Sequence, residues 1–395
     1  MTYRILPEPL PLVPPDRYPV PAEFPAAAAR IWEVAARKLR GLVDKHPDRF
    51  PLYTENGHWA VDAEAWTNWC EGFLGGQLWL VAQRTDDPWF REKAEHYSRH
   101  IEHRKHDRNV HDLGFLFWPT WRRWYEQTGD PTKDEVVVQA GRTLSTRFNE
   151  KGRYLRSFLA ADSLFVDIMM NVGIIFYAAQ RTGDPDLARI AYEHCLTTRR
   201  VLVRGDGSVS HEGIFDLDTG QFLKQTTQQG WRDDASWARG QGWAMYGFGE
   251  AYRRTGDRRF LHTATALCDF YIERTGDRLV PPNDWEEPNP TVPYESSAAA
   301  IAADALWQLA GLIQDEVRAR SYAEYALRIL VRLAQDDFLA TADPAWEGVL
   351  KHGIYHEGKK LGVDESVMWG EYWLLDAVDA VQRLIEATPQ EAQWP

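Results

Sequence analysis

Cysteine is scarce in this sequence and occurs an odd number of times. The three cysteines, Cys70, Cys195 and Cys268, are far apart along the chain. The absence of a CxxC pair or a closely spaced cysteine set argues against a disulfide framework and is typical of a reducing compartment. Long apolar runs are absent too, so we expect no membrane-spanning segment and no membrane partner.

The N-terminal segment lacks the features of a secretion signal. Residues 1–25, MTYRILPEPLPLVPPDRYPVPAEFP, contain eight prolines and no uninterrupted apolar stretch after a basic start. Such a segment favours extended backbone. We therefore predict a proline-rich arm over residues 1–25 that lies on the folded domain, and a cytoplasmic protein.

Positive charge is in deficit. Against 58 acidic residues there are 45 lysines and arginines, which gives a net charge of −13. Nucleic acid is therefore not an expected partner, and an anionic ligand would need its own local donors. No phosphate-binding loop, dinucleotide fingerprint or GxSxG elbow is present, so we predict no cofactor. The surroundings of His111 and His352 lack metal-site spacing, so no metal is predicted either.

Tryptophan is abundant, and turn signals recur. The 18 tryptophans suit a large core, although a flat indole also suits a sugar ring. Four similar stretches lie between helical patterns: RTDDP at 84–88, QTGDP at 127–131, RTGDP at 181–185 and RTGDR at 254–258. In these, glycine ends one helix, aspartate caps the next, and proline suits its first turn. Each stretch predicts the tight turn of a helix hairpin.

Hydrophobic periodicity extends this pattern to about twelve helices. The approximate ranges are 26–45, 69–84, 88–104, 112–128, 132–148, 162–182, 185–200, 237–255, 258–274, 296–314, 318–335 and 369–387. Charged helices alternate with helices rich in small and aromatic residues. A helix that is apolar on most faces is buried on most sides. We therefore predict an all-α (α/α)6 barrel, with an outer ring of helices around an inner one.

The same pattern bears on domain organisation. No linker divides residues 26–395, which we predict to form a single catalytic domain. Strand signals are weak, with short hairpins expected near 203–224 and 349–362. An open helical solenoid is the alternative architecture, although the repeat length varies and no binding-repeat signature is present.

An aspartate inside an apolar run is the first candidate site residue. The stretch SLFVDIMMN at 163–171 contains Asp167. Burying an ionised carboxylate alone is costly, so Asp167 is expected to pair with an arginine or to work in a pocket. We predict that it lies about one turn inside a helix capped by Asp162. Asp112 is expected at a helix N-terminus, where capping and catalysis are both open. Two carboxylates in one pocket, one protonated and one ionised, are the acid/base pair of glycosidic bond cleavage.

A third group of candidates follows in QQGWRDDASWARGQGW at 228–243. A helix from 237 would place Arg239 and Trp243 on one face, able to hold a carboxylate and to stack on a sugar ring. A structural arginine–aspartate pair with packed indoles is the other interpretation. His211 is expected in a loop, where a single histidine is usually solvated.

Six stretches, in order along the chain, resemble the unsaturated glucuronyl hydrolases, glycoside hydrolase family 88. They are HDLGF at 111–115, VDIMMN at 166–171, SWARGQGW at 236–243, ESSAAAIAA at 295–303, KHGIYH at 351–356 and VDESVMWGEYW at 363–373. The resemblance runs from about residue 30 to 385 and implies an (α/α)6 barrel. It also implies an enzyme that releases a Δ4,5-unsaturated uronic acid from the non-reducing end of lyase-generated oligosaccharides. The expected partner is therefore a small anionic oligosaccharide.

The resemblance also implies roles for particular residues. Water would add across the C4=C5 vinyl ether, with Asp167 as general acid and base. Asp112 would bind sugar hydroxyls and set the protonation state of Asp167. The residues that would line the sugar site are Trp69, His211, Gln229, Arg239 and Trp243. Phe158 stands where the family often has tryptophan, so it could stack but not donate a hydrogen bond.

We expect apolar surroundings to raise the pKa of Asp167, so that it carries a proton near neutral pH. Three other functions are consistent with parts of the pattern: a hydrolase of unsaturated rhamnogalacturonan fragments with the same fold and chemistry, an (α/α)6 sugar epimerase, and a non-catalytic helical-repeat carbohydrate-binding or scaffold protein. An epimerase would use histidine bases, whereas the predicted inner helices carry aspartates. The sequence leaves the linkage, sulfation, leaving sugar and oligomeric state open.

Overall fold

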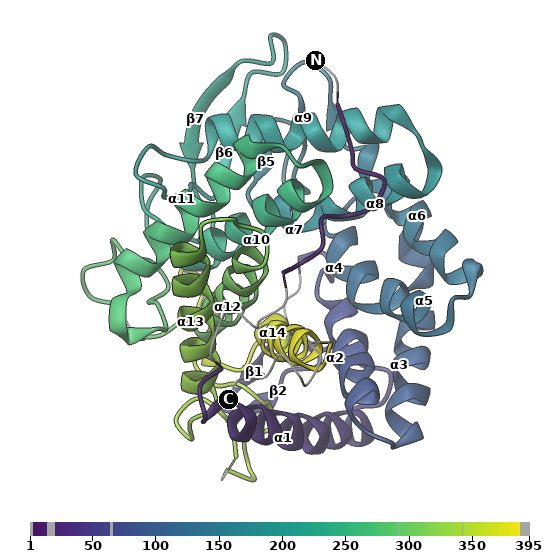
Figure 1. Cartoon of the computed structure of the whole chain (residues 1–395), viewed down its shortest axis with the longest axis vertical. Coiled ribbons are helices and arrows are strands. Elements are labelled where there is room, and N and C mark those ends of the chain that lie inside the picture. Colours follow the sequence, from purple (N-terminus) through teal and green to yellow (C-terminus); the bar gives the residue numbers. More distant parts are fainter. Residues whose placement is uncertain (1–2, 14–19, 64–65, 291, 342, 388–395) are drawn as a thin grey trace.

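Two concentric rings of helices form the molecule (Figure 1). The computed structural model describes residues 3–13, 20–63, 66–290, 292–341 and 343–387. The outer helices are α1 (Phe24–Lys45), α3 (Pro88–His100), α6 (Pro131–Ser145), α9 (Pro185–Val201), α11 (Arg258–Thr275) and α13 (Glu316–Leu333). They make the rim of the molecule in Figure 1.

The inner ring is built from six helical segments. These are α2 (Glu71–Arg84), α4 (Leu113–Phe117) with η3 (Trp118–Arg122) and α5 (Arg123–Thr128), α7 (Ile168–Asn171) with α8 (Gly173–Thr182), α10 (Ala238–Thr255), α12 (Ser296–Ala310) and α14 (Met368–Glu386). Each contacts the next in this order, and α14 returns to α2, which closes the ring. The predicted (α/α)6 barrel is confirmed, and the open solenoid is excluded.

Burial separates the two rings. Every residue of α12 is buried, whereas α3 buries only one stripe, formed by Phe90, Ala94, Tyr97 and Ser98. A helix buried on all sides belongs to the interior of a large core, and a single apolar stripe belongs to the surface. The difference in helix character read from the sequence therefore corresponds to position in the barrel.

The predicted hairpin turns are present. Glycines with positive φ end three inner helices: Gly129 (φ 66°), Gly183 (φ 69°) and Gly256 (φ 68°). The aspartates that follow cap the next outer helix through their side chains: Asp130, Asp184 and Asp257, with Asp87 doing the same before α3. Glycine tolerates the left-handed conformation, and the carboxylate satisfies free N–H groups of the first turn.

Short strands decorate the barrel. They are β1 (Thr54–Glu55), β2 (His58–Trp59), β3 (Phe148–Asn149), β4 (Tyr154–Leu155), β5 (Ser163–Phe165), β6 (Glu212–Phe215), β7 (Phe222–Thr226), β8 (Gly353–His356) and β9 (Leu361–Glu365). All pairings are antiparallel, with β6 between β5 and β7, and β8 paired with β9. Hairpins near both predicted places are therefore confirmed. Short 3-10 turns in the described part of the chain are η2 (Glu102–His106) and η4 (Gly276–Arg278).

One helix prediction was wrong at its start. Residues 163–165 form β5 and pair with β6, so the helix begins at Ile168 and not at 162. Asp167 is therefore the residue directly before α7, not one turn inside a helix. The Asp167 side chain does not cap α7, and Asp112, directly before α4, does not cap its helix either. Capping explains neither carboxylate.

The N-terminal residues cross one end of the barrel. Backbone N–H groups of Leu6 and Leu10 donate to the carbonyls of Arg254 (2.8 Å) and Arg253 (2.7 Å), at the end of α10. Val13 N–H donates to the carbonyl of Gly311, directly after α12 (2.9 Å). Residues 3–13 thus contact the C-terminal ends of inner helices. Within the described part of the chain, no helix is both long and apolar enough to span a bilayer.

Candidate active site

A cavity opens where several inner helices begin. Asp112 precedes α4, Asp167 precedes α7, and Arg239 lies in the first turn of α10. The residues that line this cavity are Trp66, Thr67, Trp69, His111, Asp112, Phe158, Phe165, Asp167, Gln229, Arg239 and Tyr355. Six of the eight residues predicted for the site therefore line one cavity: Trp69, Asp112, Phe158, Asp167, Gln229 and Arg239.

Asp112 is the more deeply buried carboxylate, with 4% of its surface exposed. His111 Nε2 lies 3.2 Å from its Oδ1, and the Thr67 hydroxyl donates a hydrogen bond to its Oδ2 (3.5 Å). Burial, together with the nearby negative charge of Asp167, raises the pKa of Asp112 to about 8. Asp112 therefore holds a proton at neutral pH.

Asp167 has the opposite character. Burial acts to raise its pKa, but the His211 imidazole and the charge of Arg239 outweigh burial, and the net pKa lies below the usual value. The expectation that apolar surroundings keep a proton on Asp167 is thus wrong for the free site. The expectation failed because the polar partners of Asp167 come from segments that are distant in the sequence. Of the two neighbouring acids, Asp112 holds the proton and Asp167 is ionised.

A histidine is aimed at each aspartate, and the backbone fixes its tautomer. His111 Nδ1 accepts a hydrogen bond from the N–H of Phe158 (2.9 Å), so its ring hydrogen is on Nε2, facing Asp112. His211 Nδ1 faces the N–H groups of Gln228 (3.1 Å) and Gln229 (3.3 Å). Its hydrogen is therefore also on Nε2, which lies 3.4 Å from Asp167 Oδ2.

His211 and His111 differ from what the sequence indicated. His211 is 2% exposed, so it is not a solvated loop residue. The His211 ring contacts the Asp167 carboxylate, but His211 is not among the residues that line the cavity. Burial lowers the pKa of His111 to about 3, which keeps it neutral beside Asp112. His111 was missed as a site residue, although its position next to Asp112 was a visible signal.

Arg239 supplies buried positive charge to the cavity wall. Its guanidinium lies between the rings of Trp237 and Trp369, 4.4 and 5.0 Å from their centroids. One terminal nitrogen donates to the carbonyl of Ile354, and the other donates to Gln229 Oε1 (2.6 Å) and to the carbonyl of Tyr355 (2.8 Å). Because both hydrogens of this second nitrogen are used within the protein, it cannot join the first nitrogen in a bidentate grip on a ligand carboxylate in this arrangement.

Comparison with known proteins places this geometry in a family. The model of Glycosyl Hydrolase Family 88 matches residues 43–277. This chain belongs to that family. It is a glycoside hydrolase with an (α/α)6 barrel, which excludes a purely structural or binding role as its sole function.

Similar proteins cover most of this family 88 chain. An unsaturated glucuronyl hydrolase of Formosa agariphila is 30% identical over 80% of this chain and 81% of its own length. The enzyme of the same name from Bacillus sp. strain GL1 is 29% identical over 89% of this chain and 97% of its own length. A solved unsaturated glucuronyl hydrolase structure that carries dGlcA-Glc-Rha-Glc superposes with a TM-score of 0.83 at 28% identity, covering 89% of this chain and 95% of the other.

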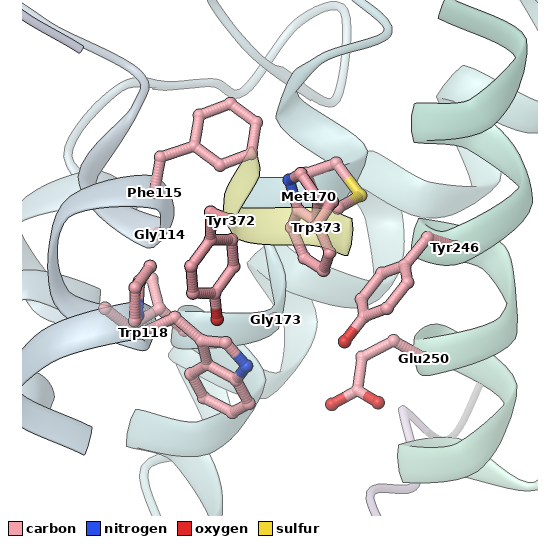
Figure 2. Close-up of a pocket in the computed structure, with 11 residues that line it drawn as sticks. Gly114, Phe115, Trp118, Met170, Gly173, Tyr246, Glu250, Tyr372 and Trp373 are labelled. Carbon is pink, nitrogen blue, oxygen red and sulfur yellow. The ribbon is translucent and has the colours of Figure 1, made fainter. Parts of the chain in front are cut away.

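Trp243 does not line the cavity that contains Asp112 and Asp167 in this family 88 enzyme. It is fully buried, and its ring packs 5.2 Å from Phe115, centroid to centroid. Phe115 also packs against Trp69 (5.5 Å) and lines a second, interior cavity. Figure 2 shows Tyr372, Tyr246 and Glu250 around that interior cavity. Trp243 therefore belongs to the packed layer under the site.

A further space, the outer cavity, adjoins the cavity of Asp112 and Asp167 and shares Trp66, Phe158 and Phe165 with it. Its other lining residues are Leu159, Gln228, His356 and Lys359. Trp66 and Tyr355 were not singled out from the sequence. Tyr355 lies within KHGIYH, one of the six stretches that carry the family resemblance, and this membership could have indicated Tyr355 as a site residue. No sequence feature indicated Trp66 as a site residue, apart from its being a tryptophan.

Proposed function

We propose that this family 88 enzyme removes a Δ4,5-unsaturated uronic acid from the non-reducing end of short anionic oligosaccharides. The observation that carries the proposal is the pairing of Asp112 and Asp167 in one cavity beside the buried charge of Arg239. The proteins named unsaturated glucuronyl hydrolase, which this chain resembles over most of its length, support the same substrate class.

The cavity suits a flat, negatively charged ring. Trp69 and Phe158 offer aromatic faces on which a sugar ring can stack, and Arg239 offers a cationic wall. Since one terminal nitrogen of Arg239 has both hydrogens engaged within the protein, the uronate carboxylate would be attracted mainly by charge at close range. This local charge offsets the repulsion from a chain of net charge −13.

The chemical step would be hydration of the vinyl ether. Asp167 delivers a proton to C4, and a water molecule adds its oxygen to C5 while Asp167 takes up the proton that this water loses. The product is a hemiketal at C5, whose ring opens and then releases the second sugar. The Asp167 carboxyl group gives up one proton and regains one from the water, so the step needs no other proton donor.

Substrate binding supplies a reason for the proton to move from Asp112 to Asp167. In the free site the charge of Arg239 helps to lower the pKa of Asp167. A uronate carboxylate beside Arg239 would neutralise much of that charge and add negative charge of its own, which raises the pKa of Asp167. Asp112 thus acts as the store of the single proton that the pair shares.

The outer cavity would hold the leaving sugar. It is bounded by Trp66 and Phe158 on the catalytic side and by the β8–β9 segment at His356 and Lys359. The exposed side chain of Leu159 lies at the same mouth. Variation in these residues would alter preference for the second sugar without changing the hydration step.

The test offers purified enzyme a panel of lyase-generated disaccharides from chondroitin, hyaluronan, heparin, gellan and rhamnogalacturonan. Loss of the ultraviolet absorbance of the conjugated double bond reports hydration. We expect turnover of at least one uronate-containing member and none of its saturated counterpart. Cleavage of the saturated counterpart at a similar rate would overturn the proposal. Preference for the rhamnogalacturonan fragment alone would identify the sister activity.

A further inference from the structure

A group of three metal-ligand side chains lies on the outer surface, between the residues that follow α1 and the end of α3. The candidate ligand atoms of Asp48, His96 and His100 all lie within 4.8 Å of one another. His96 Nε2 is 2.5 Å and His100 Nε2 is 3.9 Å from Asp48 Oδ1. None of the three lines the cavity of Asp112 and Asp167 or the outer cavity. Asp48 precedes His96 by 48 positions, so the group is not visible as a sequence motif.

The fold holds these three side chains in place. His96 and His100 are four residues apart on α3, so they project from the same face. Asp48 has a positive φ of 62°, which turns the chain sharply after α1. Phe50 then packs its ring against Tyr97 (5.2 Å between centroids) and His100 (6.5 Å). The loop is thereby fixed against α3 through apolar contacts that do not depend on an ion.

The ring of His100 has the tautomer that a metal ligand needs. Its Nδ1 lies 3.1 Å from the carbonyl oxygen of His96, and a carbonyl can only accept a hydrogen bond. Nδ1 therefore carries the hydrogen, and the Nε2 lone pair faces Asp48. A hydrogen bond from the second ring nitrogen is the usual way in which proteins orient a metal-ligating histidine.

The three side chains are also accessible from solvent. The side chains of His96, His100 and Asp48 are 42%, 42% and 59% exposed, which leaves them open to a hydrated ion.

We propose that Asp48, His96 and His100 bind one divalent transition-metal ion of the zinc class. Two imidazole nitrogens and one carboxylate oxygen suit this class, and water would complete a four-coordinate site. For Nε2 of His96 to bind the ion, the hydrogen that it now shares with Asp48 must leave that atom: a neutral His96 takes a hydrogen up at Nδ1 instead, and a doubly protonated His96 releases one proton to solvent. Because the ion would join the segment after α1 to α3, the bound form would resist unfolding better than the free form.

The test is calorimetric titration of ZnCl2 into the full chain after chelator treatment. We expect one ion per chain and a rise in the unfolding temperature. The single variants His96→Ala and His100→Ala should each bind Zn²⁺ at least about tenfold more weakly than the parent. The double variant that carries both substitutions should not bind Zn²⁺ at the same concentrations. Co²⁺ should give visible d–d absorption in the parent protein and not in the double variant.

His262→Ala, which removes an exposed single histidine on α11, is the matched control and should bind like the parent. Circular dichroism checks that each variant is folded. Mg²⁺ should not compete, because hard cations prefer oxygen ligands. Equal Zn²⁺ binding by the folded double variant and the His262→Ala control would overturn the proposal, as would binding of Mg²⁺ with the same affinity. Absence of saturable Zn²⁺ binding to the parent would overturn it as well.

Discussion

Asp112 and Asp167 show how two identical side chains acquire different protonation states. Asp112 is enclosed with a neutral histidine and a distant hydroxyl, and its pKa rises to about 8. Asp167 faces His211 and the charge of Arg239, and its pKa falls. The free site therefore carries one proton on the pair at neutral pH.

This arrangement predicts how kcat/KM depends on pH. Activity should fall above a pH of about 8, where Asp112 loses the shared proton and two anionic carboxylates repel the uronate. Protonation of Asp167 at low pH should not by itself end activity, because Asp167 must carry the proton that it delivers to C4. Initial rates on an unsaturated disaccharide between pH 3 and 10 measure this profile. A profile flat through pH 8 to 10 would disprove the assignment of Asp112.

The raised pKa of Asp112 also predicts how stability depends on pH. Below the usual aspartate pKa both states of the chain hold the proton, so there is no difference. Between that value and about 8 the unfolded chain loses the proton while the folded protein keeps it, so stability falls as pH rises.

Asp112→Asn cannot ionise and should lack this fall. The difference in unfolding free energy between the variant and the parent should therefore increase by up to about 1.4 kcal/mol per pH unit between pH 5 and 8. Urea denaturation at several pH values measures it. Parallel stability curves for the two proteins would show that Asp112 is already ionised in the folded state.

At the scale of elements, the contact between α4 and α7 sets the distance between the two aspartates. The Phe115 N–H donates to Asn171 Oδ1 (2.9 Å), and Asn171 Nδ2 donates to the carbonyl of Asp167 (3.1 Å). A Cβ on Gly114 would lie 2.6 Å from the Asn171 Cα, so only glycine allows this approach. The two helix starts that carry the site are therefore held together by close backbone packing.

Gly114→Ala should push these helices apart. We expect a loss of about 1–3 kcal/mol in unfolding free energy, and a kcat lower by at least about tenfold in the protein that remains folded. Gly41→Ala is the control, because Gly41 lies in α1 with nothing within 4 Å of an added Cβ. It should stabilise by about 0.5–1 kcal/mol with unchanged kcat. Equal kcat values for the two variants would show that the approach of α4 to α7 does not position the aspartates.

At the scale of the whole molecule, the two ends of the barrel differ: one end contains the cavities, and residues 3–13 pack across the other. The cavities lie where inner helices begin, whereas residues 3–13 cross the ends of α10 and α12. A change in these residues should therefore affect stability without affecting catalysis.

Leu10→Pro and Leu10→Ala form a matched pair for this prediction. Both lose apolar contact, but only proline lacks the N–H that donates to the Arg253 carbonyl. The proline variant should be less stable than the alanine variant by about 1 kcal/mol, with the same kcat. Thermal or urea unfolding and steady-state rates check this. A reduced kcat in the proline variant alone would link the arm to the site.

The double ring of helices could be predicted from sequence because its signals are local. Glycine–aspartate–proline turns and alternating helix character both act within about two turns of chain. The start of α7 could not, since SLFV reads equally as a buried strand or as helix. Its pairing with β6, some 50 residues later, decides for the strand.

The residues of the site could be predicted only in part, for a similar reason. Six of the predicted residues line one cavity, but the protonation of Asp167 depends on His211 and Arg239, which the fold brings from far away. Trp243 has the helical spacing of a site residue, yet the inner ring turns it into the core. Side-chain direction and electrostatic partners are properties of the closed barrel.

The most direct test of the account is turnover of an unsaturated uronate disaccharide by the parent and by Asp167→Asn in D2O, followed by NMR. We expect the parent to remove the vinylic signal and to place one deuterium at C4. We expect the folded variant to be slower by about a thousandfold or more, because it has no carboxyl group to deliver the proton. Near-normal turnover by Asp167→Asn, or product without deuterium at C4, would contradict the account.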